Sequence, residues 1–202
     1  MENFVITFAR GFGTGGKAIA SQLAKELGIH CYENRILTLA SQLSGLDENI
    51  FQEVNEKMRE TSGFSSFLRG LPRSRRYISR NEKFVSDDKL FEYQSEIIKD
   101  LAEKESCVIV GRCADFILQD RTDCLKVFVH ADLKFRADRI VRVYGEREKS
   151  PEARLKEKDK RRAAYYRFYT DMNWGNAANY HIALDSGVIG IEKSAEIIES
   201  LA

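Results

Sequence analysis

A glycine-rich segment near the start of the chain places the strongest constraint on how it can fold. Residues 11–17 (GFGTGGK) lie between an apolar run at 4–8 and an amphipathic stretch at 18–27. The run predicts a buried strand, and the stretch predicts a helix that ends at Gly28. A strand, a glycine loop and a helix that carries a lysine in its first turn have the layout of a phosphate-binding loop.

Each feature of this glycine loop suits a bound phosphate. Glycines allow successive backbone N–H groups to converge on one anion, the helix N-terminus adds partial positive charge, and Lys17 would neutralise terminal phosphates. A purely structural turn is the alternative, but strand, loop, lysine and helix agree on a nucleotide-phosphate site. The candidate binding residues are Gly11, Gly13, Thr14, Gly15, Gly16, Lys17 and Ala18.

Ala18 departs from the usual motif. The spacing satisfies G-x-x-x-x-G-K, but Ala18 occupies the position at which the motif has serine or threonine. That hydroxyl normally holds the Mg²⁺ ion that bridges the terminal phosphates. An ion here would therefore depend on water, phosphate oxygens or another side chain, and the metal ligands stay open.

Length and composition favour a single intracellular domain spanning residues 1–202. The 202 residues suffice for a substantial core, and the net charge of +1 gives no global reason to expect nucleic acid or an anionic membrane as partner. The chain has no apolar run near the ~20 residues that span a bilayer, and no signal-peptide pattern. Four cysteines without metal spacing suggest reduced thiols in the cytoplasm, namely Cys31, Cys107, Cys113 and Cys124.

Short apolar strands alternate with helices along the chain. Further strands are predicted at 30–32, 107–110, 125–129 and 180–184, and further helices at 35–44, 47–59, 87–104 and 191–201. The alternation predicts an α/β fold with a parallel sheet of about five strands and helices on both faces. Ligands bind such sheets beyond the carboxyl ends of the strands, near a topological switch point.

The segment at 61–83 differs from the rest of the chain. It is rich in serine and glycine and weakly periodic, so we expect a mobile insertion. Its arginines are Arg69, Arg73, Arg75, Arg76 and Arg80. They could help to fix an acceptor phosphate or contact RNA or an acidic partner. We rank the polyanion hypothesis last, because the chain has no overall basic bias.

A second polar cluster, residues 111–115 (GRCAD), follows the predicted strand at 107–110. Arg112 would project into the crevice that holds the glycine loop, where it could bind a second phosphate bidentately. Asp115 could accept a hydrogen bond from a sugar or a base. The alternatives are an Arg112 paired with a helix carboxylate and an Asp115 in an N-terminal turn. The nearby phosphate loop favours the functional interpretation of Arg112, whereas both interpretations of Asp115 stay open.

Arginines are also concentrated in a long charged helical stretch at 133–169, which is interrupted near Gly145 and Pro151. The pattern indicates two helical arms joined by a turn, a lid over 139–167 whose arginines close over a triphosphate. Charge neutralisation and positioning account for most catalysis of phosphoryl transfer. The alternative is a solvated face with pairs such as Glu157 and Arg161. We expect one or two members of the set to act in the lid. The set is Arg136, Arg139, Arg142, Arg147, Arg154, Arg161, Arg162 and Arg167.

Together these landmarks resemble the cytidylate kinase-like family, a branch of the P-loop nucleoside monophosphate kinases. The resemblance covers nearly the whole chain, and its most specific part is the aromatic run, the NW pair and LDSGxxGIE. The segments on which the resemblance rests are ITFARGFGTGGKAIASQLAKELG, CVIVGRCADFIL, LKVFVHADLKFRADRI and DKRRAAYYRFYTDMNWGNAANYHIALDSGVIGIEKSAEII.

The resemblance implies a P-loop kinase fold with an insertion that binds the nucleoside monophosphate and an arginine lid. It implies transfer of a phosphoryl group from ATP, with Mg²⁺, to a nucleoside monophosphate, cytidylate being the leading acceptor. By matching motif, residues 11–17 would hold the donor phosphates and Arg112 the acceptor phosphate. Arg142 and Arg161 would belong to the lid.

The chain departs from cytidylate kinases at two motifs. Their loop resembles G-x-S-G-x-G-K-[GS]-[ST], whereas Thr14 replaces a glycine here and Ala18 has no hydroxyl. They carry G-R-D where this chain has Cys113 after the arginine, so a carboxylate is missing or displaced to Asp115. A nucleotide-binding regulator or degenerate kinase, or a kinase of another small acceptor, is therefore the alternative.

Overall fold

The computed structural model describes residues 3–51, 76–78 and 84–202, with side chains from 3–51 and 87–202. Apart from the backbone of 76–78, the predicted insertion at 61–83 lies outside the described residues, as do the side chains of all its arginines. The same holds for positions 52–59 of the helix predicted at 47–59.

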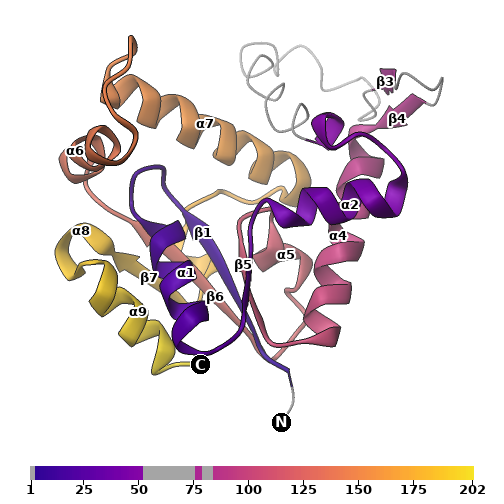
Figure 1. The fold of residues 1–202 in the computed structure, drawn as a ribbon, viewed down its shortest axis with the longest axis horizontal. Coiled ribbons are helices and arrows are strands. Elements are labelled where there is room, and N and C mark those ends of the chain that lie inside the picture. The colour runs from indigo at the N-terminus through magenta and orange to yellow at the C-terminus, as the bar shows by residue number, and fades with distance from the viewer. Residues whose placement is uncertain (1–2, 52–75, 79–83) are drawn as a thin grey trace.

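A five-stranded parallel sheet forms the centre of the molecule (Figure 1). Its order is β2-β5-β1-β6-β7. Central strand β1 pairs in parallel with β5 on one side and with β6 on the other. The strands are β1 (Val5–Arg10), β2 (His30–Tyr32), β5 (Cys107–Val110), β6 (Cys124–His130) and β7 (Ile182–Asp185). The predicted sheet is thus confirmed, with strand ends that differ by no more than two residues.

Helices cover both faces of this sheet. α1 (Gly16–Glu26) and α9 (Ile191–Glu199) pack together on one face. The opposite face is covered by α2 (Arg35–Ser44), α4 (Asp87–Lys104) and α5 (Ala114–Ile117). A short antiparallel pair, β3 (Arg76–Ile78) and β4 (Phe84–Ser86), precedes α4.

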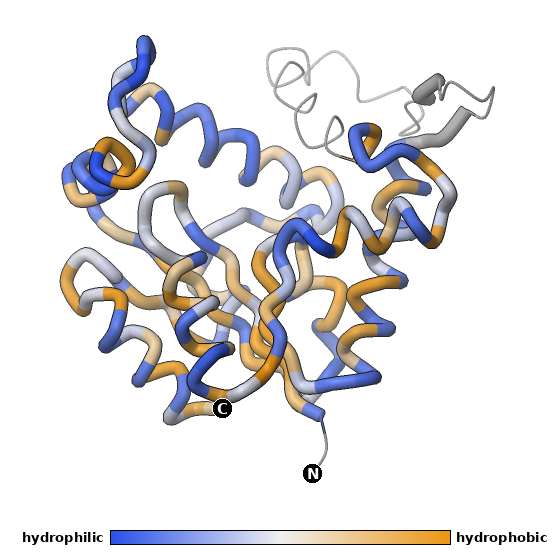
Figure 2. The backbone as a smooth tube through the Cα atoms, viewed as in Figure 1, coloured by the Kyte–Doolittle hydropathy of each residue, from blue (hydrophilic) through white to orange (hydrophobic). Residues whose placement is uncertain are grey.

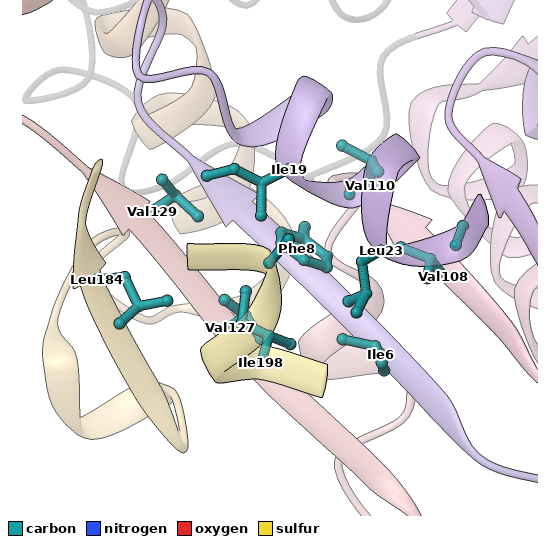
Figure 3. Packing of buried hydrophobic residues seen from close by; sticks show 13 residues of the cluster. Ile6, Phe8, Ile19, Leu23, Val108, Val110, Val127, Val129, Leu184 and Ile198 are labelled. Atoms are coloured by element: carbon teal, nitrogen blue, oxygen red, sulfur yellow. The ribbon is translucent and has the colours of Figure 1, made fainter. Parts of the chain in front are cut away.

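The core explains why the strands are continuous apolar runs. Ile6 and Phe8 of β1 point to the face covered by α1, where they meet Ile19 and Leu23 (Figure 3). Val5 lies in the cluster on the opposite face. Because both faces of the sheet are buried, the strands need apolar residues on each side. Ile19 and Leu23 are spaced by one helical turn, which places both on the core side of α1.

Two helices form a hairpin beyond the carboxyl ends of the strands (Figure 1). α6 (Leu133–Tyr144) begins after Asp132, whose carboxylate accepts from Phe135 N at 2.8 Å. α7 (Pro151–Thr170) begins after Ser150, which accepts from Ala153 N at 3.2 Å. Such caps satisfy free amides at helix starts. The predicted break between two helical arms is confirmed, and Figure 2 colours α7 mostly hydrophilic, in contrast to the central strands.

Two further features bear on the sequence-based expectations. The four cysteines all lie in the described part of the chain and carry free thiols. No helix in that part has the length and apolar character needed to cross a membrane.

Candidate active site

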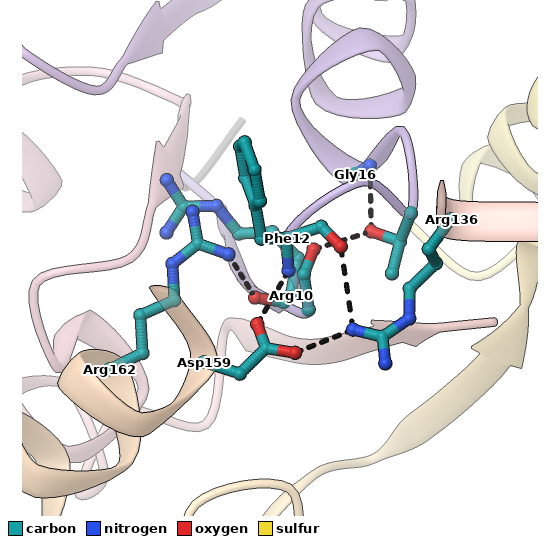
Figure 4. Close-up of polar contacts among 8 residues, drawn as sticks. Arg10, Phe12, Gly16, Arg136, Asp159 and Arg162 are labelled. Atoms are coloured by element: carbon teal, nitrogen blue, oxygen red, sulfur yellow. Dashed lines mark hydrogen bonds and ion pairs between the residues drawn. The ribbon is translucent and has the colours of Figure 1, made fainter. Parts of the chain in front are cut away.

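The glycine loop joins β1 to α1 and leaves several backbone donors unused. Buried Thr14 fixes its shape, because its hydroxyl donates to Gly11 O at 3.0 Å and accepts from Gly16 N at 3.2 Å (Figure 4). The first turn of α1 has neither a side-chain cap nor an acidic residue. Among the described residues, no acceptor is found for the amides of Gly13, Gly15, Lys17 and Ala18. Unpaired amides at a helix start make an anion-binding site.

The residues that follow β7 brace this loop from the side. Asp185 accepts from Gly187 N at 2.9 Å and thereby starts the short helix α8 (Ser186–Ile189). Buried Ser186 donates to the carbonyl oxygen of Thr14 at 2.6 Å. The specific LDSG block in the sequence therefore supports the loop.

Glu33 connects the loop lysine to the end of β1. Its Oε2 lies 2.6 Å from Lys17 Nζ, and its Oε1 lies 2.9 Å from Arg10 Nη2. Burial by itself would raise the pKa of Glu33, but the hydrogen bonds and charges of Lys17 and Arg10 outweigh burial and lower that pKa. Glu33 is therefore a carboxylate anion shared between two cations.

This shared anion predicts a pH-dependent contribution to stability. A carboxyl with a lowered folded-state pKa stabilises the protein above its ordinary value of 4.5 and loses this effect as pH falls through the folded-state value. We expect Glu33→Gln to cost about 1–3 kcal/mol at pH 7, and this cost to shrink as pH falls below 4.5. Urea unfolding at several pH values measures the difference. Glu26→Gln, an exposed change on α1, is the control, and a cost independent of pH would contradict the prediction.

A strained turn after β5 presents Arg112 to the same region. Gly111, Arg112 and Cys113 have φ angles of +80°, +62° and +57°, so three consecutive residues are left-handed. This conformation costs an L-residue roughly 1–2 kcal/mol, and such strain is concentrated at functional sites. Burial lowers the pKa of the Arg112 guanidinium. Cys113 packs in an apolar cluster with Tyr165 and Tyr166.

Asp115 supplies a carboxylate two residues beyond Cys113. It lies in the first turn of α5, is 6% exposed and accepts a hydrogen bond from the Tyr166 hydroxyl at 2.7 Å. Burial raises the pKa of Asp115, and the hydrogen bond from Tyr166 opposes this shift. Asp115 is thus both a first-turn residue and part of the cavity described next.

Arg112 and Asp115 line a cavity of about 480 Å³. The described residues bring five cationic and three carboxylate side chains to it, an excess of positive charge that favours an anionic ligand. The cationic residues are Arg10, Arg112, Lys158, Arg161 and Arg162, and the acidic residues are Glu33, Glu48 and Asp115. Tyr165, Tyr166 and Trp174 complete the aromatic part of the wall.

The helical hairpin is docked onto the glycine loop through main-chain contacts. Asp159 of α7 accepts from Phe12 N at 2.7 Å and forms an ion pair with Arg136 of α6 at 2.5 Å (Figure 4). Arg162 donates to the carbonyl oxygen of Arg10 at 2.8 Å and lies 5.8 Å from the centre of the Phe12 ring. The hairpin and the loop are thus held together by charged side chains.

The two predicted lid arginines have different positions. Arg161 lines the cavity. Arg142 is exposed in the last turn of α6 and is not part of the cavity wall. Its role in the lid stays a prediction.

The sequence interpretation missed Arg10 and Glu33, and it did not single out Arg162. Arg10 ends β1 and Glu33 directly follows β2, so both occupy the carboxyl end of a parallel strand. Arg112 was selected because it follows the carboxyl end of a strand. The same reasoning would have identified Arg10 and Glu33. Arg162 was one of eight similar candidates, four of which lie in α7, a helix that is polar on most sides.

The parallel sheet, the glycine loop after its central strand and the helical hairpin beyond it define the fold of a P-loop kinase. The chain belongs to the cytidylate kinase-like family, whose sequence profile matches residues 5–188. No curated protein matches the chain significantly.

Solved structures agree with this fold. An uncharacterized protein from Eubacterium ventriosum superposes with a TM-score of 0.69 at 24% identity, covering 98% of each chain. Shikimate kinase from Acinetobacter baumannii gives a TM-score of 0.51 at 12% identity, covering 98% of this chain and 92% of its own. Shikimate kinase from Bacteroides thetaiotaomicron gives a TM-score of 0.50 at 13% identity, covering 98% of this chain and 97% of its own.

Proposed function

We propose that the protein transfers a phosphoryl group from ATP to a nucleoside monophosphate, with cytidylate as the leading acceptor. The observation that carries this proposal is a pair of anion-binding features at the ends of neighbouring strands. The glycine loop follows β1, and Arg112 follows β5. The first suits a polyphosphate donor. The second lines a cavity with two more cations than carboxylates, which suits a phosphate monoester of about −1.5 to −2 charge.

The donor would bind as the Mg²⁺ complex of ATP. Lys17 and the loop amides would hold its phosphates. Within the described residues, no group of three or more histidine, cysteine or acidic side chains could hold a metal ion. Magnesium commonly keeps phosphate oxygens and waters as ligands and needs only one or two carboxylates. Glu33, whose carboxylate contacts Lys17, would supply one such carboxylate ligand to the ion.

The acceptor would bind in the cavity. Arg112 would orient its phosphate, and Asp115 would accept a hydrogen bond from its sugar or base. A phosphate oxygen is already a competent nucleophile, so this reaction needs no general base. Arg161, and Arg142 after a movement of α6, would neutralise the transferring group, while the hairpin excludes water.

The test is a direct assay of purified protein with ATP and Mg²⁺. CMP, dCMP, UMP, AMP and GMP are supplied separately, and each nucleoside diphosphate is measured by chromatography. We expect diphosphate formation, fastest with a cytidine nucleotide. Absence of diphosphate with every acceptor, while ATP still binds, would contradict the proposal.

A nucleotide-binding regulator without turnover is the second candidate, and Ala18 is the observation that favours it. We expect Ala18→Ser to change turnover less than about tenfold, because phosphate oxygens and Glu33 already suit the metal. Ala18→Cys is the matched control, since it adds a similar volume without a hard oxygen ligand. A large, Mg²⁺-dependent gain in Ala18→Ser alone would instead indicate a decayed kinase site.

A kinase of another small acceptor is the third candidate. Two of the solved structures with this fold are shikimate kinases, and a phosphate loop specifies the donor more than the acceptor. Adding hydroxy acids and phosphorylated sugars to the same assay separates this candidate from the first.

A further inference from the structure

Arg10 is a mostly buried cation that the phosphate-loop motif does not explain. Its side chain is 16% exposed and lines the same cavity as Arg112. Burial and the positive charge of Arg112 lower the pKa of Arg10, and the charge of Glu33 opposes them. Two arginines whose positive charges interact therefore line one cavity.

The Arg10 side chain lies directly against the turn that carries Arg112. A Cβ atom at Gly111 would lie 2.3 Å from Arg10 Nη1, so a larger residue at position 111 would displace the Arg10 guanidinium. The Arg10 guanidinium thus reaches from the end of β1 to the turn after β5. It lies against the residue that precedes Arg112.

Within the part of the chain that the structure describes, most of the hydrogen-bonding capacity of Arg10 is unused. A guanidinium has five N–H donors, and the one acceptor found for it among the described residues is Glu33, at 2.9 Å. The hydrogen bond that Arg162 donates to Arg10 goes to the main-chain carbonyl, so that bond does not require the Arg10 side chain. The hairpin contact therefore does not explain why a cation occupies this mostly buried position.

We propose that Arg10 and Arg112 together bind the phosphate of the acceptor, and that Arg10 restricts acceptors to phosphate monoesters. The inference rests on the proposed function and names the specificity residue of the same cavity. Each guanidinium can offer two parallel N–H groups to phosphate oxygens. Arg10 shares the single charge of Glu33 with Lys17. A doubly charged phosphate therefore offers further negative charge to both guanidinium groups, whereas a carboxylate offers one negative charge and a neutral nucleoside offers none.

Measuring the binding of CMP and ATP at equilibrium tests this inference without requiring phosphoryl transfer, and so separates it from the proposed function. We expect Arg10→Gln to weaken CMP binding, measured by calorimetry, at least tenfold, while ATP affinity changes less than threefold and the unphosphorylated nucleoside cytidine binds as in wild type. Arg10→Lys should recover part of the loss. Ribose 5-phosphate should show the same loss if the phosphate is the group recognised. Unchanged CMP binding in Arg10→Gln would overturn the inference, even if phosphoryl transfer proceeds.

Gly111→Ala provides a second test that leaves Arg10 itself unaltered. The added methyl group would push the Arg10 guanidinium away. Gly28→Ala is the matched control, because Gly28 has a φ of +67° but no atom within 4 Å of the added Cβ. We expect Gly111→Ala to weaken CMP binding at least tenfold and Gly28→Ala to leave it unchanged. Equal CMP affinities of the two folded variants would overturn the inference.

Discussion

Lys17→Ala is expected to lower turnover by about 100- to 1,000-fold, because it removes the cation that would stabilise charge on the transferring phosphates. Folding should be almost unaffected. The Lys17 side chain is 63% exposed, and its partner Glu33 keeps its ion pair with Arg10. Initial rates with ATP and CMP measure the first effect, and thermal unfolding measures the second.

The control for this variant lies on the same helix. Lys25→Ala removes an equally charged, exposed residue from the last turn of α1. Its turnover should match that of the wild type. If Lys17→Ala retained full activity, the glycine loop would not be the donor site.

Arg112→Gly is expected to separate stability from acceptor binding. Glycine adopts the left-handed conformation at this position without strain, and the change removes a partly buried positive charge that interacts unfavourably with that of Arg10. The free energy of unfolding should stay the same or rise by up to about 1 kcal/mol. The affinity for CMP should fall by about 100-fold, the effect of losing roughly 3 kcal/mol of charge-assisted hydrogen bonds.

Arg112→Lys is the comparison for that variant, since it keeps both the charge and the backbone strain. We expect it to bind CMP better than Arg112→Gly and to be no more stable than the wild type. Chemical denaturation and calorimetry give the two quantities. A marked loss of stability in Arg112→Gly would show that Arg112 serves the fold instead of the ligand.

The sequence predicted the sheet well because the physical signal was local. Strands buried on both faces must be apolar throughout, so the runs around Ile6, Val108 and Val127 were visible without any tertiary information. The break at Gly145 and Pro151 was equally local, since one residue ends α6 and the other begins α7. The resemblance then supplied the family.

The polar part of the site was harder to predict, because its contacts join distant segments. Arg10 pairs with a residue 23 positions away, and Phe12 with a residue 147 positions away. No spacing rule indicates such pairs. The hairpin posed a second difficulty: α7 is charged on most sides, so its pattern could not show that Arg161 and Arg162 line the cavity.

The contacts of the hairpin with the glycine loop have one more consequence. Asp159 and Arg136 bind the N–H and C=O of position 12, and Arg162 binds the C=O of position 10. All three contacts recognise the path of the main chain, whichever side chains it bears. Exchanging the aromatic ring at position 12 would therefore leave these three attachments in place and remove only the packing of the ring itself against Tyr144 and Arg162 of the hairpin.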